Sequence, residues 1–263
     1  MTATTERPGL AGDQLVELMA LMRGSDSVEL KLTVPEVQQR STIASLGIDP
    51  LEAQIRQVFF LDTPDLRLNA AGLVVRLRRV QGKRADSVVK LRPVIPTELP
   101  DDLRRSPDFR VEVDAMPGGF VCSASMKGVT ENQQVLDTVA GIVPARRTFD
   151  KEQRRFFEAY APDGLKLDDL SFLGPIFVLK AKWSPGDGLP RMVAEVWLYP
   201  DGSRVLELST KCLPGDAFQV AAEARAFLHE RGIDITGEQQ TKTKQALSFF
   251  ASPTPASTPP DRV

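Results

Sequence analysis

Alternation of apolar and charged residues with a period of two predicts most of the regular structure in this chain. In the segment 27–34, Ser27, Glu29 and Lys31 share one face of an extended strand, and apolar residues occupy the other. The same pattern recurs in six later segments, at 73–80, 88–93, 109–114, 179–182, 193–198 and 204–211. The last two segments flank Tyr-Pro-Asp-Gly, which is typical of a hairpin turn. The sequence therefore predicts at least seven strands, each with a charged face and an apolar face.

Apolar residues at helical spacing predict four or five helices beside these strands. The predicted helices lie at 13–23, 35–46, 131–143, 216–231 and 242–250. Thr33 with Glu36, and Thr130 with Gln133, have the spacing of capping boxes. The segment 93–107 is rich in proline and acidic residues and is expected to form a long loop between strands.

These elements predict one α+β domain at residues 13–250 without an internal linker. Residues 1–12 are small and polar, and residues 251–263 are rich in proline, serine and threonine. Such segments have too few apolar side chains to join a packed core, so both are expected to be disordered tails.

Composition excludes several classes of function. The 33 basic and 35 acidic residues leave a net charge of −2, which does not favour nucleic acid or a membrane surface as a partner. The sequence has no signal-peptide pattern and no apolar run long enough to span a bilayer, so we expect a cytoplasmic protein. The single histidine, His229, lies in a predicted amphipathic helix, and Cys122 and Cys212 lack zinc-site spacing. Histidine-based catalysis and a zinc site are therefore not expected.

The charged strand faces differ from the chain average. They hold nine cations, Lys31, Arg76, Arg78, Lys90, Arg92, Arg110, Lys180, Lys182 and Lys211, and five anions, Glu29, Glu112, Asp114, Glu195 and Glu207. These faces therefore total +4 in a chain of −2. One interpretation is an antiparallel sheet whose charged side is solvated. The other is a binding site for a polyanion, because clustered cations are unfavourable unless an anion joins them, and the interleaved carboxylates suit a hard divalent cation.

Several of these segments together resemble a known family. In chain order they are VELK (28–31), FFLDTPDLRLNAAGLVVRLRR (59–79), DSVVKLRP (86–93), RVEVD (110–114) and LELSTK (206–211). They are similar to motifs of the CYTH superfamily, the triphosphate tunnel metalloenzymes. That superfamily includes class IV adenylate cyclases, thiamine triphosphatases and inorganic triphosphatases.

The resemblance implies a closed antiparallel barrel of eight strands, a tunnel with a charged interior and helices packed outside. It implies that a first set of residues contacts the phosphates of the substrate: Lys31, Arg76, Arg78, Lys90 and Arg110. Further candidates for substrate binding are Arg92, Arg154, Lys180, Lys182, Lys211 and Lys244. The metal, Mg²⁺ or Mn²⁺, would be held by Glu29, Glu112, Glu195 and Glu207.

Two positions depart from the family pattern, since Ser27 and Ser209 stand where carboxylates are expected. Three functions therefore remain open: a metal-dependent triphosphate hydrolase, an adenylate cyclase, and a non-catalytic polyphosphate-binding module. Tripolyphosphate, ATP and thiamine triphosphate are the candidate substrates. Single-stranded nucleic acid is not an expected ligand, because Trp197 is the main aromatic residue among the basic strands.

Overall fold

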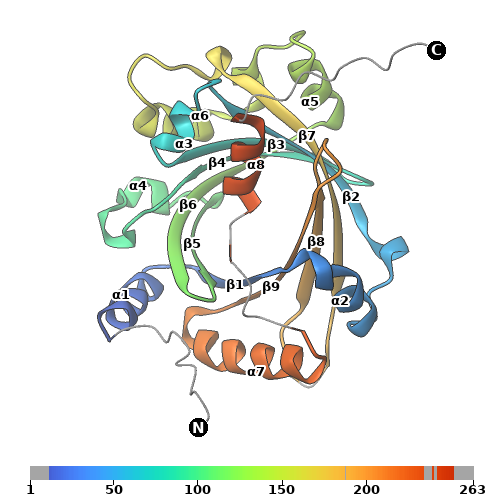
Figure 1. Ribbon diagram of the computed structural model, residues 1–263. Coiled ribbons are helices and arrows are strands. Elements are labelled where there is room, and N and C mark those ends of the chain that lie inside the picture. Colours follow the sequence, from blue (N-terminus) through green and yellow to red (C-terminus); the bar gives the residue numbers. More distant parts are fainter. Residues whose placement is uncertain (1–11, 187, 234–238, 240–241, 252–263) are drawn as a thin grey trace, which may run out of the picture.

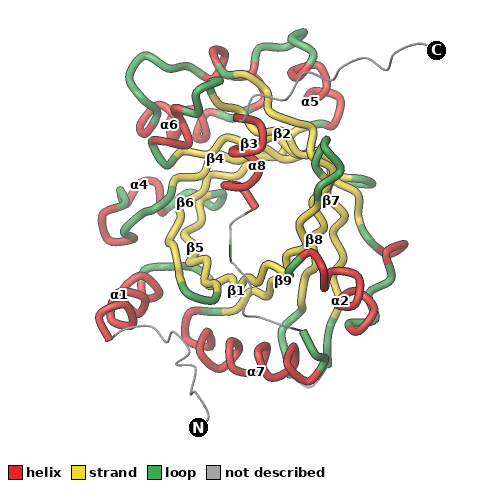
Figure 2. The backbone as a smooth tube through the Cα atoms, viewed as in Figure 1, coloured by secondary structure: helices red, strands yellow, loops and turns green. Residues whose placement is uncertain are grey.

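Nine strands in the described part of the chain close into a barrel (Figures 1 and 2). The structure, a computed structural model, describes residues 12–186, 188–233, 239 and 242–251. The strands are β1 (Ser27–Val34), β2 (Gln54–Asp62), β3 (Leu73–Val80), β4 (Ala85–Leu91), β5 (Phe109–Met116), β6 (Gly119–Thr130), β7 (Ser171–Trp183), β8 (Met192–Leu198) and β9 (Arg204–Cys212). Their order around the barrel is β1-β5-β6-β4-β3-β2-β7-β8-β9, and β9 closes the ring on β1.

The expectation of eight antiparallel strands was wrong in the number of strands and in the direction of one strand pair. The described barrel has nine strands, and β1 pairs in parallel with β5, with Glu29 opposite Asp114. Because β6 turns back and inserts between β4 and β5, β5 is left to meet β1. Alternation identifies the faces of a strand but not the direction of its neighbour, so the sequence pattern does not reveal the parallel pair.

Alternation also missed two strands for a physical reason. The second half of β2, from Val58 to Leu61, is buried on both faces and therefore reads as a continuous apolar run. In β6, Ser123 and Ser125 stand opposite Glu112 and Arg110 of β5, so its inner face has few charges to mark it. The predicted hairpin of β8 and β9 is confirmed, with Gly202 at φ +84° in its turn.

The predicted helices are present; three have shorter bounds, and α1 and α8 are each one residue longer than predicted. The helices are α1 (Gly12–Arg23), α2 (Gln39–Ser45), α3 (Arg67–Ala70), α4 (Asp101–Arg104), α5 (Asn132–Val139), α6 (Lys151–Tyr160), α7 (Ala217–Glu230) and α8 (Lys242–Ala251). Neither predicted cap forms: Pro35 precedes the 3-10 turn at 36–38, and Glu131 is the N-cap of α5. The expected tails at 1–12 and 251–263 lie almost wholly outside the described residues.

Helices cover the outer apolar faces of the strands. Phe156 and Phe157 of α6 pack in one core cluster with Phe109, and Phe227 of α7 packs with Leu208 in another. The predicted helices did not include α6, although Asp150 and Gln153 form a capping box at its start. Burial of these apolar faces leaves the charged faces to point into the barrel.

Part of the barrel interior is apolar rather than charged. Phe60, Trp197 and Val205 lie in a third core cluster together with Ala246 and Leu247 of α8. In Figure 2, α8 lies across the opening of the ring of strands. The charged side chains therefore share an interior that α8 covers on one side.

Candidate active site in the barrel interior

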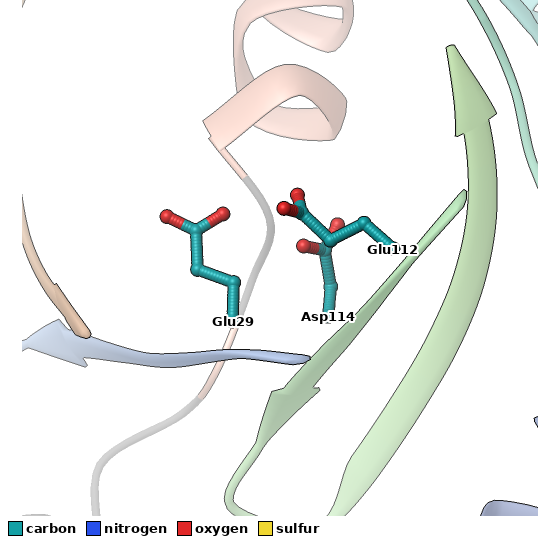
Figure 3. Close-up of side chains that lie close together, drawn as sticks. All are labelled: Glu29, Glu112 and Asp114. Atoms are coloured by element: carbon teal, nitrogen blue, oxygen red, sulfur yellow. The ribbon is translucent and has the colours of Figure 1, made fainter. Parts of the chain in front are cut away.

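Three carboxylates from two neighbouring strands meet inside the barrel. The parallel register sets Glu29 of β1 opposite Asp114 of β5, and Glu112 lies one inward position before Asp114. One carboxylate oxygen from each residue lies within 4.8 Å of the other two. Figure 3 shows the three side chains projecting into the same space. Because oxygen donors at this spacing are what Mg²⁺ and Mn²⁺ prefer, these residues fit a divalent cation.

Lysines contact this acidic cluster and favour the ionised forms of Asp114 and Glu29. Lys31 Nζ lies 2.8 Å from Asp114 Oδ1 and 3.2 Å from Glu29 Oε2, and Lys90 Nζ lies 3.4 Å from Asp114 Oδ2. Burial by itself would raise the pKa of Asp114, but attraction to Lys31 and Lys90 outweighs it and holds that pKa well below its usual range. Burial opposes the charge of Lys31 as well, but Asp114 and Glu29 lift its pKa well above the ordinary value.

The third member of the acidic cluster, Glu112, is paired with a more exposed lysine than Asp114 is. Lys211 forms an ion pair with it, and 56% of the Lys211 side chain is exposed. Ser27 Oγ donates a hydrogen bond to Glu112 Oε2 at 3.2 Å. The serine that replaces the expected first acid therefore still contacts the cluster, and Asp114 supplies a third carboxylate that was not among the predicted metal ligands.

The other two predicted ligands form a separate group. Glu195 of β8 stands opposite Glu207 of β9, and Lys242 at the start of α8 forms ion pairs with both, 2.6 Å from Glu207 Oε1. Lys180 Nζ lies 2.8 Å from Glu195 Oε1, and Trp197 Nε1 donates to Glu195 Oε2 at 3.3 Å. Burial opposes ionisation of Glu195, but Lys242 and Lys180 outweigh it and hold its pKa well below the usual range. Burial raises the pKa of Glu207, because Lys242 only partly offsets it.

A third group is cationic and centres on Arg76. Arg78 is paired, since its Nε and Nη2 donate to Asp86 Oδ2 at 2.9 and 2.6 Å. Arg76 forms no hydrogen bond or ion pair with any described residue, and its Nε is buried without a partner among them. Burial and the neighbouring Arg78 lower the pKa of Arg76 to about 10. A half-buried guanidinium whose donors have no acceptor among the described residues is suited to an anion that enters from solution.

Two further cations of this region were missed because β2 and β6 were not predicted as strands. Arg56 of β2 donates to Gln54 and lies 3.8 Å from Glu195 Oε1. Burial lowers the pKa of Lys127 on β6. The nearby cations Arg78 and Arg76 lower this pKa further, whereas Asp86 raises it. The alternation of Arg56 with Val58 and Phe60 was the signal that could have placed Arg56 inside.

The remaining predicted residues are dispersed. Arg110 and Lys182 share the inward face of their strands but are exposed, whereas Arg92 is half-buried, and its burial lowers its pKa. Arg154 does not join the interior: α6 contacts β4 and β6 from outside, and Arg154 Nη1 donates to the carbonyl of Phe149 at 2.7 Å. The side chain of Lys244 lies outside the described residues.

The histidine and one of the two cysteines lie apart from the acidic cluster. His229 is exposed on α7, and burial raises the pKa of the Cys122 thiol to about 11. Among the described residues, the acidic cluster of Glu29, Glu112 and Asp114 is the one set of three metal-type side chains that converges. No helix within the described ranges has the length and apolar character needed to cross a membrane.

Comparison with known proteins agrees with the fold. No family model and no curated protein sequence matches the chain. The structure is similar to a candidate adenylate cyclase from Bacillus halodurans, with a TM-score of 0.59, 11% identity, and coverage of 84% of this chain and 97% of that one. It is similar to a candidate adenylyl cyclase from Hippeastrum described as having a dominant triphosphatase activity, with a TM-score of 0.61, 15% identity, and coverage of 84% and 95%. The chain therefore shares its fold with these two proteins.

Proposed function

We propose that this chain is a metal-dependent hydrolase that cleaves a triphosphate bound inside the barrel. The observation that carries the proposal is Arg76, a half-buried arginine whose Nε is buried and which has no anion partner among the described residues, next to Arg78 in the same interior as the acidic cluster. A phosphate oxygen pair would accept two parallel hydrogen bonds from Arg76. Fixed cations would also stabilise the charge that develops on the phosphoryl oxygens during transfer.

The acidic cluster supports metal dependence. Glu29, Glu112 and Asp114 would hold Mg²⁺ or Mn²⁺, and the bound ion would supply Lewis-acid polarisation of a phosphoryl oxygen. Lys31 and Lys90 contact Asp114 and would hold phosphate oxygens beside the cluster. With Asp114, three carboxylates converge even though serines stand at positions 27 and 209, where acids were expected. The two serines therefore do not favour a purely binding role.

Hydrolysis is favoured over cyclisation by the surroundings of the interior aromatic residues. A cyclase must also bind adenine, which usually stacks on an aromatic or apolar surface. Trp197, Tyr199 and Phe60 are each at most 5% exposed, and Trp197 and Tyr199 share a core cluster with Ala246 and Leu247 of α8. These rings therefore offer no free stacking face, which favours inorganic tripolyphosphate or a substrate whose organic group stays outside the barrel.

The reaction products separate the three candidate functions. The purified chain is incubated with tripolyphosphate, ATP or thiamine triphosphate in Mg²⁺ or Mn²⁺, while orthophosphate, pyrophosphate and cyclic AMP are quantified. We expect orthophosphate and pyrophosphate from tripolyphosphate, no cyclic AMP from ATP, and loss of turnover with a chelator. Cyclic AMP as the main product would establish the cyclase, and saturable binding without turnover would establish the binding module.

Substitution of Arg76 tests the observation behind the proposal. Arg76→Met removes a half-buried charge that has no partner among the described residues, so the free chain is expected to be as stable as wild type or more stable. Affinity for tripolyphosphate should fall by about 30-fold or more, since loss of a buried charged contact costs roughly 2–5 kcal/mol. Arg79→Met, on the opposite face of β3, is the matched control. Unchanged affinity in Arg76→Met, measured by calorimetry, would contradict the assignment.

A further inference from the structure

Lys242 is enclosed like an ion in a cation site. Its ammonium contacts Glu207 Oε1 at 2.6 Å, forms an ion pair with Glu195 and lies 5.4 Å from the centre of the Trp197 ring. The side chains of Glu207, Glu195 and Lys242 are 3%, 11% and 15% exposed. Two carboxylates and an aromatic face therefore surround one positive charge that belongs to the chain itself.

This arrangement differs from the acidic cluster of Glu29, Glu112 and Asp114. The cation on Glu112 is Lys211, which is largely exposed and can move into solvent at small cost when a metal ion arrives. Lys242 has no such freedom, because Ala246 and Leu247 on the same helix are 0% and 2% exposed. Withdrawing Lys242 would require α8 to separate from the apolar part of the interior.

We propose that Lys242 is a built-in cation that takes the place of a second divalent ion beside Glu195 and Glu207, so that the barrel binds a single divalent ion at Glu29, Glu112 and Asp114. Position and charge balance explain the exclusion. The ammonium of Lys242 lies between the two glutamates, and together with Lys180 it already matches their two charges, so an added divalent ion is repelled. The acidic cluster keeps three carboxylates against two half-buried lysines, Lys31 and Lys90, once Lys211 moves away. Without the ammonium, Glu207 loses its contacting cation and Glu195 retains Lys180 and Arg56. Glu207 and the Oε2 atom of Glu195, which Lys180 and Arg56 do not contact, can then bind a divalent ion.

Counting bound Mn²⁺ tests the inference. The full chain is titrated with Mn²⁺, and free ion is measured by electron paramagnetic resonance for wild type, Lys242→Met, Lys242→Gln and Lys242→Arg. We expect one ion per chain in wild type and Lys242→Arg, and two in the Met and Gln variants. Lys151→Met, an exposed substitution on α6, is the matched control and should keep one ion. Adding Glu207→Gln to Lys242→Met should return the count to one.

Two results would overturn the inference: two ions in wild type, or one ion in both the Met and Gln variants. Circular dichroism and thermal melting establish that each variant is folded before it is counted. The inference rests on the metal dependence in the proposed function, but different results would reject the inference and the proposed function. A change from one ion to two without triphosphate hydrolysis would reject the hydrolase alone, whereas hydrolysis by a wild-type chain with two ions would reject the role of Lys242 alone.

Discussion

At the scale of single residues, the charged side chains inside the barrel differ in whether they contact a partner of opposite charge. Asp114 contacts Lys31 and Lys90 and is 1% exposed, whereas Arg76 has no such partner among the described side chains. Alternation predicted that Lys31, Lys90 and Asp114 share charged faces, but the pairing depends on the parallel contact of β1 with β5. Asp114 and Arg76 both lie on charged strand faces, but only Asp114 has partners of opposite charge among the described residues.

The lowered pKa of Asp114 predicts how stability depends on pH. A carboxyl group whose folded pKa lies below its ordinary value of 3.8 stabilises the fold above that value and loses the contribution as pH falls. Glu195 acts with the same sign. We expect the melting temperature of wild type to fall below about pH 4. Differential scanning fluorimetry from pH 3 to 7 measures this dependence.

Asp114→Asn should be less stable than wild type at pH 7 and should show a shallower decline in acid. Removing one partner of a buried ion pair costs roughly 3–5 kcal/mol, because Lys31 and Lys90 lose their buried anion. Asp108→Asn, an exposed substitution next to the same strand, should follow the wild-type curve. If Asp114→Asn and wild type had parallel pH curves, the interpretation of Asp114 would be wrong.

At the scale of elements, polar contacts and not only apolar packing attach the helices to the barrel. Gln153 of α6 is 0% exposed, accepts a hydrogen bond from Ser87 Oγ at 2.8 Å and donates to the carbonyls of Ser87 and Met126 at 3.0 and 3.2 Å. A Cβ at Gly128 would lie 2.5 Å from Gln153 Oε1, so this close approach requires glycine. Nothing in the sequence pattern predicts a contact between residues so far apart in the chain.

Substitution of Gln153 should weaken the attachment of α6. Gln153→Ala leaves buried polar groups on β4 and β6 without partners, which costs roughly 1–3 kcal/mol. Urea unfolding compares this variant with Glu152→Ala, an exposed change on the same helix that should be nearly neutral. Equal unfolding free energies for the two variants would show that α6 is held by its apolar side chains alone.

At the scale of the whole molecule, the net charge of −2 is the sum of a positively charged set of strand faces inside the barrel and a negatively charged remainder of the chain. Triphosphate should therefore stabilise the fold much more than an equal ionic strength of NaCl. Binding at 100 times the dissociation constant contributes about 2.7 kcal/mol. Thermal melts with tripolyphosphate, orthophosphate and NaCl measure this, and the tripolyphosphate shift should be smaller in Arg76→Met. Equal shifts from all three salts would mean that the interior has no preference for a phosphate chain.

The sequence by itself determined the faces of seven strands, five of the helices and most of the charged residues inside the barrel. These follow from local periodicity and residue type, which each segment expresses independently. Only the tertiary structure decided that nine strands close the barrel, that Asp114 joins Glu29 and Glu112, that Arg154 stays outside, and that Lys242 lies between Glu195 and Glu207. Strand direction, ring closure and helix docking depend on contacts between distant segments, and local periodicity does not encode them.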